Sequence, residues 1–367
     1  MTERERLLTF LTDDDFDEPL FIPLADGNYA ATVVGKDLVT ETDLADQLHA
    51  ARVTGYSPIV FPGIDPAETD PELGYRKVSE TRAGDKIRRD YTLETPEGPL
   101  TRAHVEQPHL GVSDIEMPVK DEQDLPALRW VAQRICSGPC EEGVRRQCRA
   151  AREQVGEEAL TVVQVGQAFE LMNSILLHDI PVLYLTAQDA YMETVAAVAE
   201  AQKRLARLML ESGIDLIWMG TPGTELFSPS MMTDAVVPCA RKMADHVHRC
   251  GGLVYFHSCG KNREFIGRGF YNQIRPDLFE TLAGPPTGDI EDIGRARRQI
   301  APEIRTKGNL DGGLMFRGSV EEVVTAARNI LERTRGTRHA LGLSDAVLFG
   351  TPPDTMRAVS DLVREFH

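Results

Sequence analysis

A histidine and a cysteine stand two residues apart at the end of an apolar run, Leu253-Val-Tyr-Phe-His257-Ser-Cys259-Gly260-Lys-Asn262. Side chains alternate across a β-strand, so residues two apart point to the same side. The imidazole of His257 and the thiolate of Cys259 could therefore bind one ion, and these are donors that zinc prefers. The spacing is equally compatible with a buried histidine beside a small apolar cysteine, because no second ligand pair follows it.

The elements that must position these two residues are short apolar runs, each followed by Gly, Pro, Asn or Asp and then by a helical pattern. This alternation is typical of a (β/α)8 barrel, in which catalytic groups lie at the C-terminal ends of the strands. We therefore expect one α/β domain over residues 1–367, a TIM barrel with an N-terminal extension. The eight expected strands are Leu20–Leu24, Pro58–Pro62, Thr161–Gly166, Asp215–Gly220, Leu253–Ser258, Leu278–Leu282, Ile304–Asn309 and Ala340–Ser344.

Amphipathic helical patterns lie between these strands, as in 193–212, 231–249 and 320–333, and Ser319 is expected to cap the last of them. The stretch of approximately 74–118 lacks this period and alternates charged with β-forming residues. We read it as an antiparallel insertion of two or three strands after the second barrel strand, folded over the barrel mouth.

Composition argues against several classes of partner. The formal net charge is −17, whereas nucleic acids and anionic membranes are bound through basic patches, so we expect neither as a partner. The N-terminus is polar, and no stretch approaches the roughly 18 continuous apolar residues of a spanning helix. We therefore expect a cytoplasmic protein, whose six cysteines are thiols or metal ligands and not disulfides.

The string Phe256-His-Ser-Cys-Gly-Lys-Asn262 resembles the H-x-C-G zinc motif of methylcobamide:thiol methyltransferases. These enzymes belong to the uroporphyrinogen decarboxylase superfamily, whose fold is a (β/α)8 barrel, and the resemblance covers nearly the whole chain. The other segments that resemble the superfamily are 61–65, 166–172, 213–215, the Ser228-Pro229 turn, 308–311 and 350–353.

The residues that bind the tetrapyrrole in true uroporphyrinogen decarboxylases are not matched here. Their arginine-rich segment falls at Ala25-Asp-Gly-Asn-Tyr29, which has no arginine, and their aspartate-bearing segment falls at Phe61-Pro-Gly63. Their tyrosine falls at Ser174 and their late histidine at Asp345. An octa-anionic substrate would also meet a net charge of −17 without a cationic clamp. Decarboxylation of uroporphyrinogen is therefore not expected.

The resemblance to the methyltransferase branch implies a zinc ligand set. His257 and Cys259 match two ligands, and Glu280 falls where the family has an exchangeable glutamate. The family's second cysteine is missing, and Asp345 stands at its place, six residues before Thr351. A carboxylate is an acceptable zinc ligand, so we expect His257, Cys259, Glu280 and Asp345 to converge within about 5 Å of one point at the C-terminal barrel face.

Further polar residues are weaker candidates. Asp215, Asn309 and Asp311 are expected at strand ends on the active face as catalytic residues, with hydrogen bonding to ligands or loop capping as the alternative. The residues expected to bind substrate are Asn28, Gln167, Glu170 and Asn173.

The resemblance implies a zinc-dependent methyltransferase that exchanges a methyl group between a small substrate and a corrinoid protein. One thiolate and two carboxylates make a harder zinc site than two thiolates, which favours a methyl ether substrate and O-demethylation. No D-x-H-x-x-G motif is present, so methylcobalamin or another corrinoid is expected on the partner protein. The alternatives are a cofactor-independent decarboxylase of a small acid and a non-catalytic corrinoid- or tetrapyrrole-binding barrel. The methyl donor, the acceptor and a possible homo-oligomer stay open.

Overall fold

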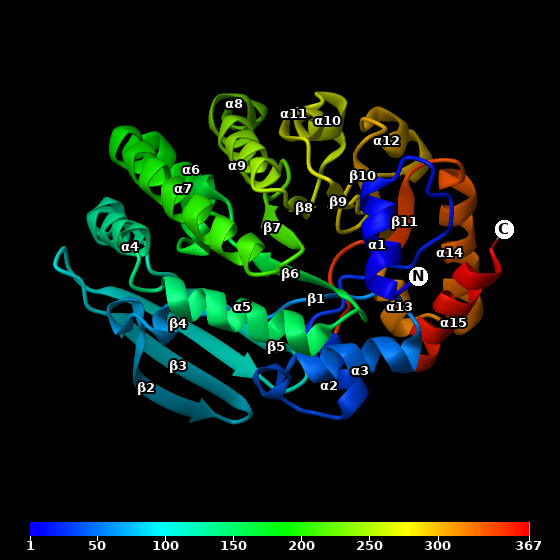
Figure 1. Ribbon diagram of the computed structural model, residues 1–367, viewed down its shortest axis with the longest axis horizontal. Coiled ribbons are helices and arrows are strands. Elements are labelled where there is room, and N and C mark those ends of the chain that lie inside the picture. Colours follow the sequence, from blue (N-terminus) through cyan, green and yellow to red (C-terminus); the bar gives the residue numbers. More distant parts are fainter. Residues whose placement is uncertain (367) are drawn as a thin grey trace.

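A parallel sheet forms the centre of the computed structural model, which describes residues 1–366 (Figure 1). Its seven strands follow one another in chain order, and every neighbouring pair is parallel, as helical crossovers require. The strands are β1 (Ile59–Val60), β6 (Leu160–Gln164), β7 (Leu216–Gly220), β8 (Leu253–Ser258), β9 (Leu278–Thr281), β10 (Arg305–Leu310) and β11 (His339–Leu343).

The segment Leu20–Leu24, the first of the eight expected strands, is not a regular strand but lies where a strand would close the barrel. It makes one isolated parallel bridge to β11 and one to Ala346 after it. The carbonyl of Phe21 accepts a hydrogen bond from Ser57 N, just before β1, at 2.9 Å. Pro23 has no N–H to donate to a ladder, and Pro58 and Pro62 flank β1 and shorten it in the same way. The prediction of a closed barrel is therefore only partly right. The sheet is a seven-stranded half-barrel, and this segment lies between its two edge strands, β11 and β1.

Helices surround the parallel sheet, so that its strands lie at the centre of the molecule (Figure 1). The expected helices are present, and Ser319 caps its helix with Glu322 in a capping box. The helices are α1 (Glu3–Thr12), α2 (Gly27–Val34), α3 (Leu44–Thr54), α4 (Leu125–Ser137), α5 (Glu141–Val155), α6 (Asp179–Thr186), α7 (Gln188–Glu211), α8 (Pro229–Met231), α9 (Val237–Arg249), α10 (Arg263–Gly267), α11 (Phe270–Ile274), α12 (Ile293–Gln299), α13 (Gly312–Arg317), α14 (Val320–Thr334) and α15 (Pro353–Glu365).

The insertion is an antiparallel sheet of four strands, one more than the upper expectation, and it lies to one side of the parallel sheet (Figure 1). Leu93 and Leu100 on its inner face pack against Ala127 of α4. The turn before its last strand reaches the segment after β11, where the rings of His109 and Phe349 lie 5.0 Å apart. That the insertion covers the mouth of the barrel stays a prediction. The strands are β2 (Arg76–Ala83), β3 (Lys86–Leu93), β4 (Leu100–Gln107) and β5 (Gly111–Glu116).

The N-terminal end of the parallel sheet is filled with apolar side chains. Leu7, Phe10 and Leu11 of α1 form one cluster with residues of the strands such as Leu216 and Tyr255. Since this end is packed, polar side chains that face a ligand must lie at the other end, where His257 and Cys259 stand.

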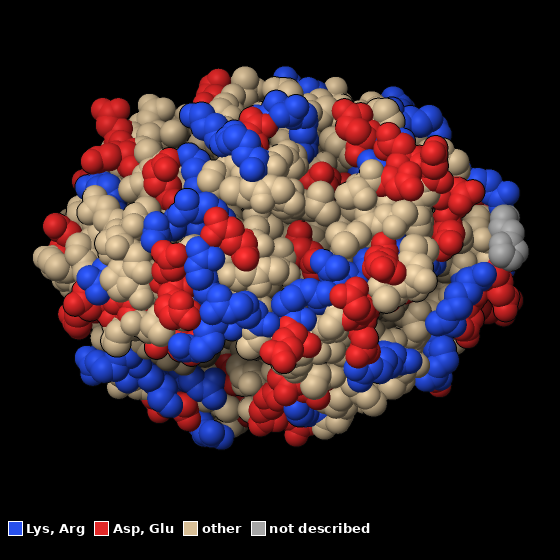
Figure 2. All heavy atoms as spheres, in the orientation of Figure 1, with Lys and Arg blue, Asp and Glu red and all other residues tan. Residues whose placement is uncertain are grey.

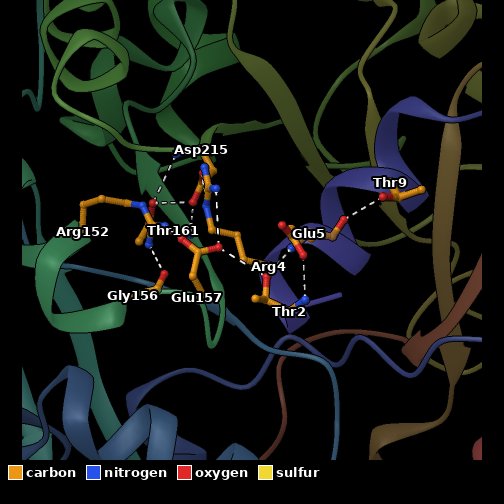
Figure 3. A network of polar contacts seen from close by, with 9 residues as sticks. All are labelled: Thr2, Arg4, Glu5, Thr9, Arg152, Gly156, Glu157, Thr161 and Asp215. Carbon is orange, nitrogen blue, oxygen red and sulfur yellow. Dashed lines mark hydrogen bonds and ion pairs between the residues drawn. The ribbon is translucent and has the colours of Figure 1, made fainter.

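Asp215 lies at the packed end and not on the active face, so the expected catalytic placement is wrong. It precedes β7, and the first residues of parallel strands share the N-terminal end of a sheet. Its Oδ1 accepts a hydrogen bond from Arg4 at 2.7 Å, and its Oδ2 accepts from Thr161 N at 2.8 Å and Thr161 Oγ1 at 2.9 Å (Figure 3). The carboxylate thus ties α1 to β6 and β7.

The charged residues are mixed on the visible surface. Acidic and basic side chains are interspersed over the face drawn in Figure 2, so the net charge of −17 is not gathered into one patch there. No helix within residues 1–366 is both long and apolar enough to cross a membrane. The six cysteines are free thiols, as expected.

Replacing Asp215 by Asn tests its structural role. The variant keeps the side-chain size but leaves the guanidinium of Arg4, 26% exposed, with only the more distant and more exposed Glu157 as its anion, at 3.8 Å. The free energy of unfolding should therefore fall by about 1–3 kcal/mol in a urea titration. Asp354→Asn is the control, because the Asp354 side chain is 84% exposed beside Arg357 and its loss should cost less than about 0.5 kcal/mol. Equal losses in the two variants would contradict the assignment.

Candidate active site

His257 and Glu280 lie opposite each other at the C-terminal ends of β8 and β9. The ladder pairs these two residues directly, and His257 Nδ1 lies 2.8 Å from Glu280 Oε1. The imidazole ring packs against the ring of Trp218 on β7, with centroids 5.4 Å apart. The carboxylate therefore fixes which ring nitrogen of His257 is engaged and leaves Nε2 for another partner.

Lys307 on β10 holds the other oxygen of Glu280, and sequence reasoning missed it. Its ammonium group forms an ion pair with Glu280 Oε2, both side chains are only 1% exposed, and the ammonium lies 5.2 Å from the ring centroid of Tyr255. A lysine in the middle of a buried strand was the available signal, because lysine is rarely buried without a partner.

These three groups form a buried cluster of charges whose ionised states support one another. Burial raises the pKa of Glu280, but Lys307 and His257 outweigh it and bring that pKa down to about 2. Burial lowers the pKa of His257, but its contacts with Cys259 and Glu280 outweigh this and raise the pKa to about 10. The protein without a bound ion thus carries a cation on either side of the Glu280 carboxylate.

The loop that carries Cys259 is fixed by Asn262. Its Nδ2 donates to the carbonyls of Ser258 at 2.8 Å and Gly260 at 3.2 Å, while its Oδ1 accepts from Ser258 Oγ at 2.8 Å and from the hydroxyl of Tyr271. Gly260 has φ +80°, a conformation that favours glycine, and it closes the turn. These bonds explain why the motif continues to Asn262 and hold Cys259 beside His257.

Asp345 follows β11 and is exposed, and its Oδ1 accepts a hydrogen bond from Ala346 N at 2.8 Å. Its charge acts on His257 and Lys307. Within residues 1–366 no three His, Cys, Asp or Glu side chains lie together as a metal site. The expected convergence of His257, Cys259, Glu280 and Asp345 is therefore not present, because Lys307 and His257 occupy both oxygens of Glu280 and Asp345 turns to its own backbone.

The residues expected to bind substrate divide into two groups. Gln167 and Glu170 are buried in the loop after β6, whereas Asn173 is exposed at its end. Asn28 Nδ2 donates to the carboxylate of Asp26 at 3.0 Å, beside the N-terminus of α2. Of these four residues, Gln167 and Glu170 are the two that are buried after β6, the strand next to β7.

Asn309 and Asp311 make the bonds that the loop-capping alternative requires. Asn309 Nδ2 donates to the carbonyl of Leu282 at 3.0 Å, and Asp311 accepts from Leu314 N at 2.6 Å as the N-cap of α13. Both side chains hold loops at the C-terminal end of the sheet in place.

A family model described as uroporphyrinogen decarboxylase (URO-D) matches residues 103–366. The chain belongs to the uroporphyrinogen decarboxylase family. Uroporphyrinogen decarboxylase from Prochlorococcus marinus strain MIT 9313 is 23% identical over 281 residues, which cover 73% of this chain and 71% of that protein. The protein of the same name from Trichodesmium erythraeum is 22% identical over 280 residues, which cover 73% and 70%.

A solved structure described as a methyltransferase from Methanosarcina mazei superposes on this family member with a TM-score of 0.71. It covers 100% of this chain and 99% of its own, at 17% sequence identity. At that identity the likeness shows a shared fold, and the expected superfamily is confirmed by the family model.

A double-mutant cycle can measure how much the charges of Lys307 and Glu280 stabilise each other. Lys307→Met leaves the buried Glu280 carboxylate with only one of its two cations, His257, and should lower the free energy of unfolding by about 3–5 kcal/mol. Adding Glu280→Gln should recover part of that loss, giving a coupling energy of about 1–3 kcal/mol from urea titrations of the four proteins. Additive losses would show that the two charges do not stabilise each other.

Proposed function

We propose that this protein is a zinc-dependent methyltransferase that exchanges a methyl group between a small substrate and a corrinoid protein. The observation that carries the proposal is the arrangement of His257, whose Nδ1 lies 2.8 Å from Glu280, beside Cys259 at the C-terminal end of β8. A carboxylate on one nitrogen of an imidazole is the usual support for a zinc ion on the other.

The side chains present fit a zinc ion at this place. His257 through Nε2 and Cys259 through its thiolate would hold the ion, and Asp345, exposed and bonded only to its neighbour's backbone, is the carboxylate free to turn toward them. Glu280 orients His257, and Lys307 keeps Glu280 ionised. Bound zinc would supply Lewis acidity to a substrate oxygen or sulfur.

The segment around Asp26 argues against a tetrapyrrole substrate. Where the resemblance places the arginines of true decarboxylases, Asp26 accepts a hydrogen bond from Asn28 N at 2.8 Å and caps α2. Asp26 is half-buried, its desolvation raises its pKa, and it supplies no cation for the substrate's carboxylates.

A methyl ether is the proposed substrate class, with O-demethylation as the direction of transfer. A site with one thiolate is harder than the two-thiolate site of thiol methyltransferases, and hard Lewis acids prefer oxygen. The corrinoid would arrive on its own protein at the C-terminal end of the sheet. The similar fold of the Methanosarcina mazei methyltransferase supports the same class of reaction.

Cys259→Ser tests the zinc assignment. The variant should fold normally, because a side chain at a strand end serves the site more than the core, but it should lose most of its zinc and at least about 100-fold of its methyl transfer. Zinc content after dialysis and circular dichroism measure the two effects. Cys136→Ser is the control, since Cys136 is exposed and lies far along the chain in α4. Unchanged zinc in Cys259→Ser would contradict the assignment.

Asp345→Cys tests the substrate class. The variant should still bind zinc, because His and two Cys are acceptable donors, but a softer site should prefer sulfur. Demethylation of an aryl methyl ether should fall about 10-fold, while methyl transfer from methylcobalamin to a free thiol should rise. Both assays are run on both proteins at equal zinc content. If the wild type already methylates thiols well and the variant does no better, the hardness argument is wrong.

A further inference from the structure

Three buried polar atoms on the loops after the neighbouring strands β6 and β7 lack a hydrogen bond of normal geometry. The atoms are Gln167 Nε2, Glu170 Oε1 and Thr221 Oγ1, and each of these residues is at most 6% exposed. Leaving a buried polar atom unsatisfied costs free energy, so such atoms rarely gather without a ligand to meet them. They therefore mark a polar subsite.

Thr221 connects this subsite to His257. Its N–H donates to the carbonyl of His257 at 3.0 Å, and its carbonyl accepts from Ser258 Oγ at 3.0 Å. Its hydroxyl lies beside the Glu170 carboxyl, on which the charge of His257 also acts. Glu170 and Thr221 thus stand next to the strand end that carries the proposed zinc ligands.

The loop that carries Glu170 is held in one conformation. The ring of Phe169 packs edge-on against the rings of Tyr191 and Phe227, and the hydroxyl of Tyr191 donates to the carbonyl of Phe169 at 2.5 Å. Leu171 and Met172 have φ of 50° and 56°, which residues with a side chain adopt only where their surroundings enforce it. The position of Glu170 is therefore imposed by the fold.

The surroundings of Glu170 favour its neutral form. Burial raises its pKa to about 8, although His257 on β8 and Thr221 oppose the shift, and the other titratable group that it faces is Tyr191 on α7. A protonated carboxyl donates a hydrogen bond, as does the Gln167 amide, whose oxygen is already engaged by Ala168 N at 3.0 Å. The subsite thus offers donors, which suit a substrate oxygen.

From these unpartnered donors beside His257, we propose that Glu170 is the general acid that protonates the substrate oxygen, with Gln167 and Thr221 positioning that oxygen. This inference rests on the proposed demethylation of a methyl ether. It adds a proton source that the zinc ligands do not supply.

The step balances as follows in atoms and electrons. The methyl–oxygen bond breaks, its electron pair stays on the oxygen, and the methyl group passes to the partner's reduced corrinoid, which contributes the electron pair of the new bond. The proton of Glu170 passes to the oxygen and gives an alcohol or phenol. The Glu170 carboxylate then takes a proton from water.

Infrared difference spectroscopy tests the protonation of Glu170 without turnover. The wild type at pH 7 should show the carbonyl stretch of a buried protonated carboxyl, and Glu170→Gln should lack it. Glu193→Gln is the control, because the side chain of Glu193 is 69% exposed on α7. A spectrum in which Glu170→Gln removes only carboxylate bands would overturn the inference.

Rates with aryl methyl ethers of graded phenol acidity test the proton transfer itself. Glu170→Gln keeps a hydrogen-bond donor but no transferable proton, so kcat should fall by about 10²–10⁴-fold for the least acidic phenols and much less for the most acidic, with KM little changed. A uniform loss across the series, or a loss in KM alone, would overturn the role of Glu170 and leave the proposed function intact. A wild type inactive with every ether would overturn both.

Discussion

The carboxylate of Glu280 sits between two cations, Lys307 and His257, in a part of the protein from which water is nearly excluded. Each of these charges would be costly to bury alone, and removing Glu280 leaves both cations without their anion. The cluster requires β8, β9 and β10 to meet in one register, because the three side chains project inward from three adjacent strands. The position of the imidazole, and with it the proposed zinc site, follows from that register.

The two ends of the parallel sheet differ in their side chains: the N-terminal end is packed with apolar residues, and the C-terminal end carries the polar ones. Apolar residues of α1 fill the N-terminal end, and Asp215 fastens that end through Arg4 and Thr161 (Figure 3). Loops after the strands carry the polar side chains at the opposite end, where Asn262 and the aromatic residues around Phe169 hold them. The packed N-terminal end therefore supports a C-terminal end at which polar side chains gather.

Sequence reasoning found the parts of the molecule that local pattern determines. The strand Leu253–Ser258 was predicted with its observed bounds, and the capping role of Ser319 was confirmed, since alternation and capping are local signals. Membership of the family was also predicted and is confirmed. The shortened β1 was visible in principle, because Pro58 and Pro62 flank it.

Contacts between residues far apart in the chain could not be predicted from the sequence. Glu280 was expected as a ligand from the family resemblance. Its pairing with Lys307, 27 residues later by sequence number, could not be known from the sequence. Asp215 was expected at the wrong end of the sheet although it directly precedes its strand, and only its bonds to Arg4 and Thr161 show what it does. Thr221 carries no motif, and its importance comes from the burial of its hydroxyl without a partner beside Glu170.

X-ray absorption spectroscopy at the zinc edge, on wild-type protein loaded with one equivalent of zinc, tests the central claim most directly. His257 and Cys259 as ligands predict one sulfur scatterer at about 2.3 Å together with nitrogen or oxygen scatterers at about 2.0–2.2 Å, including the imidazole pattern of a histidine. Zinc that binds with oxygen scatterers alone, or fails to bind at all, would contradict the claim.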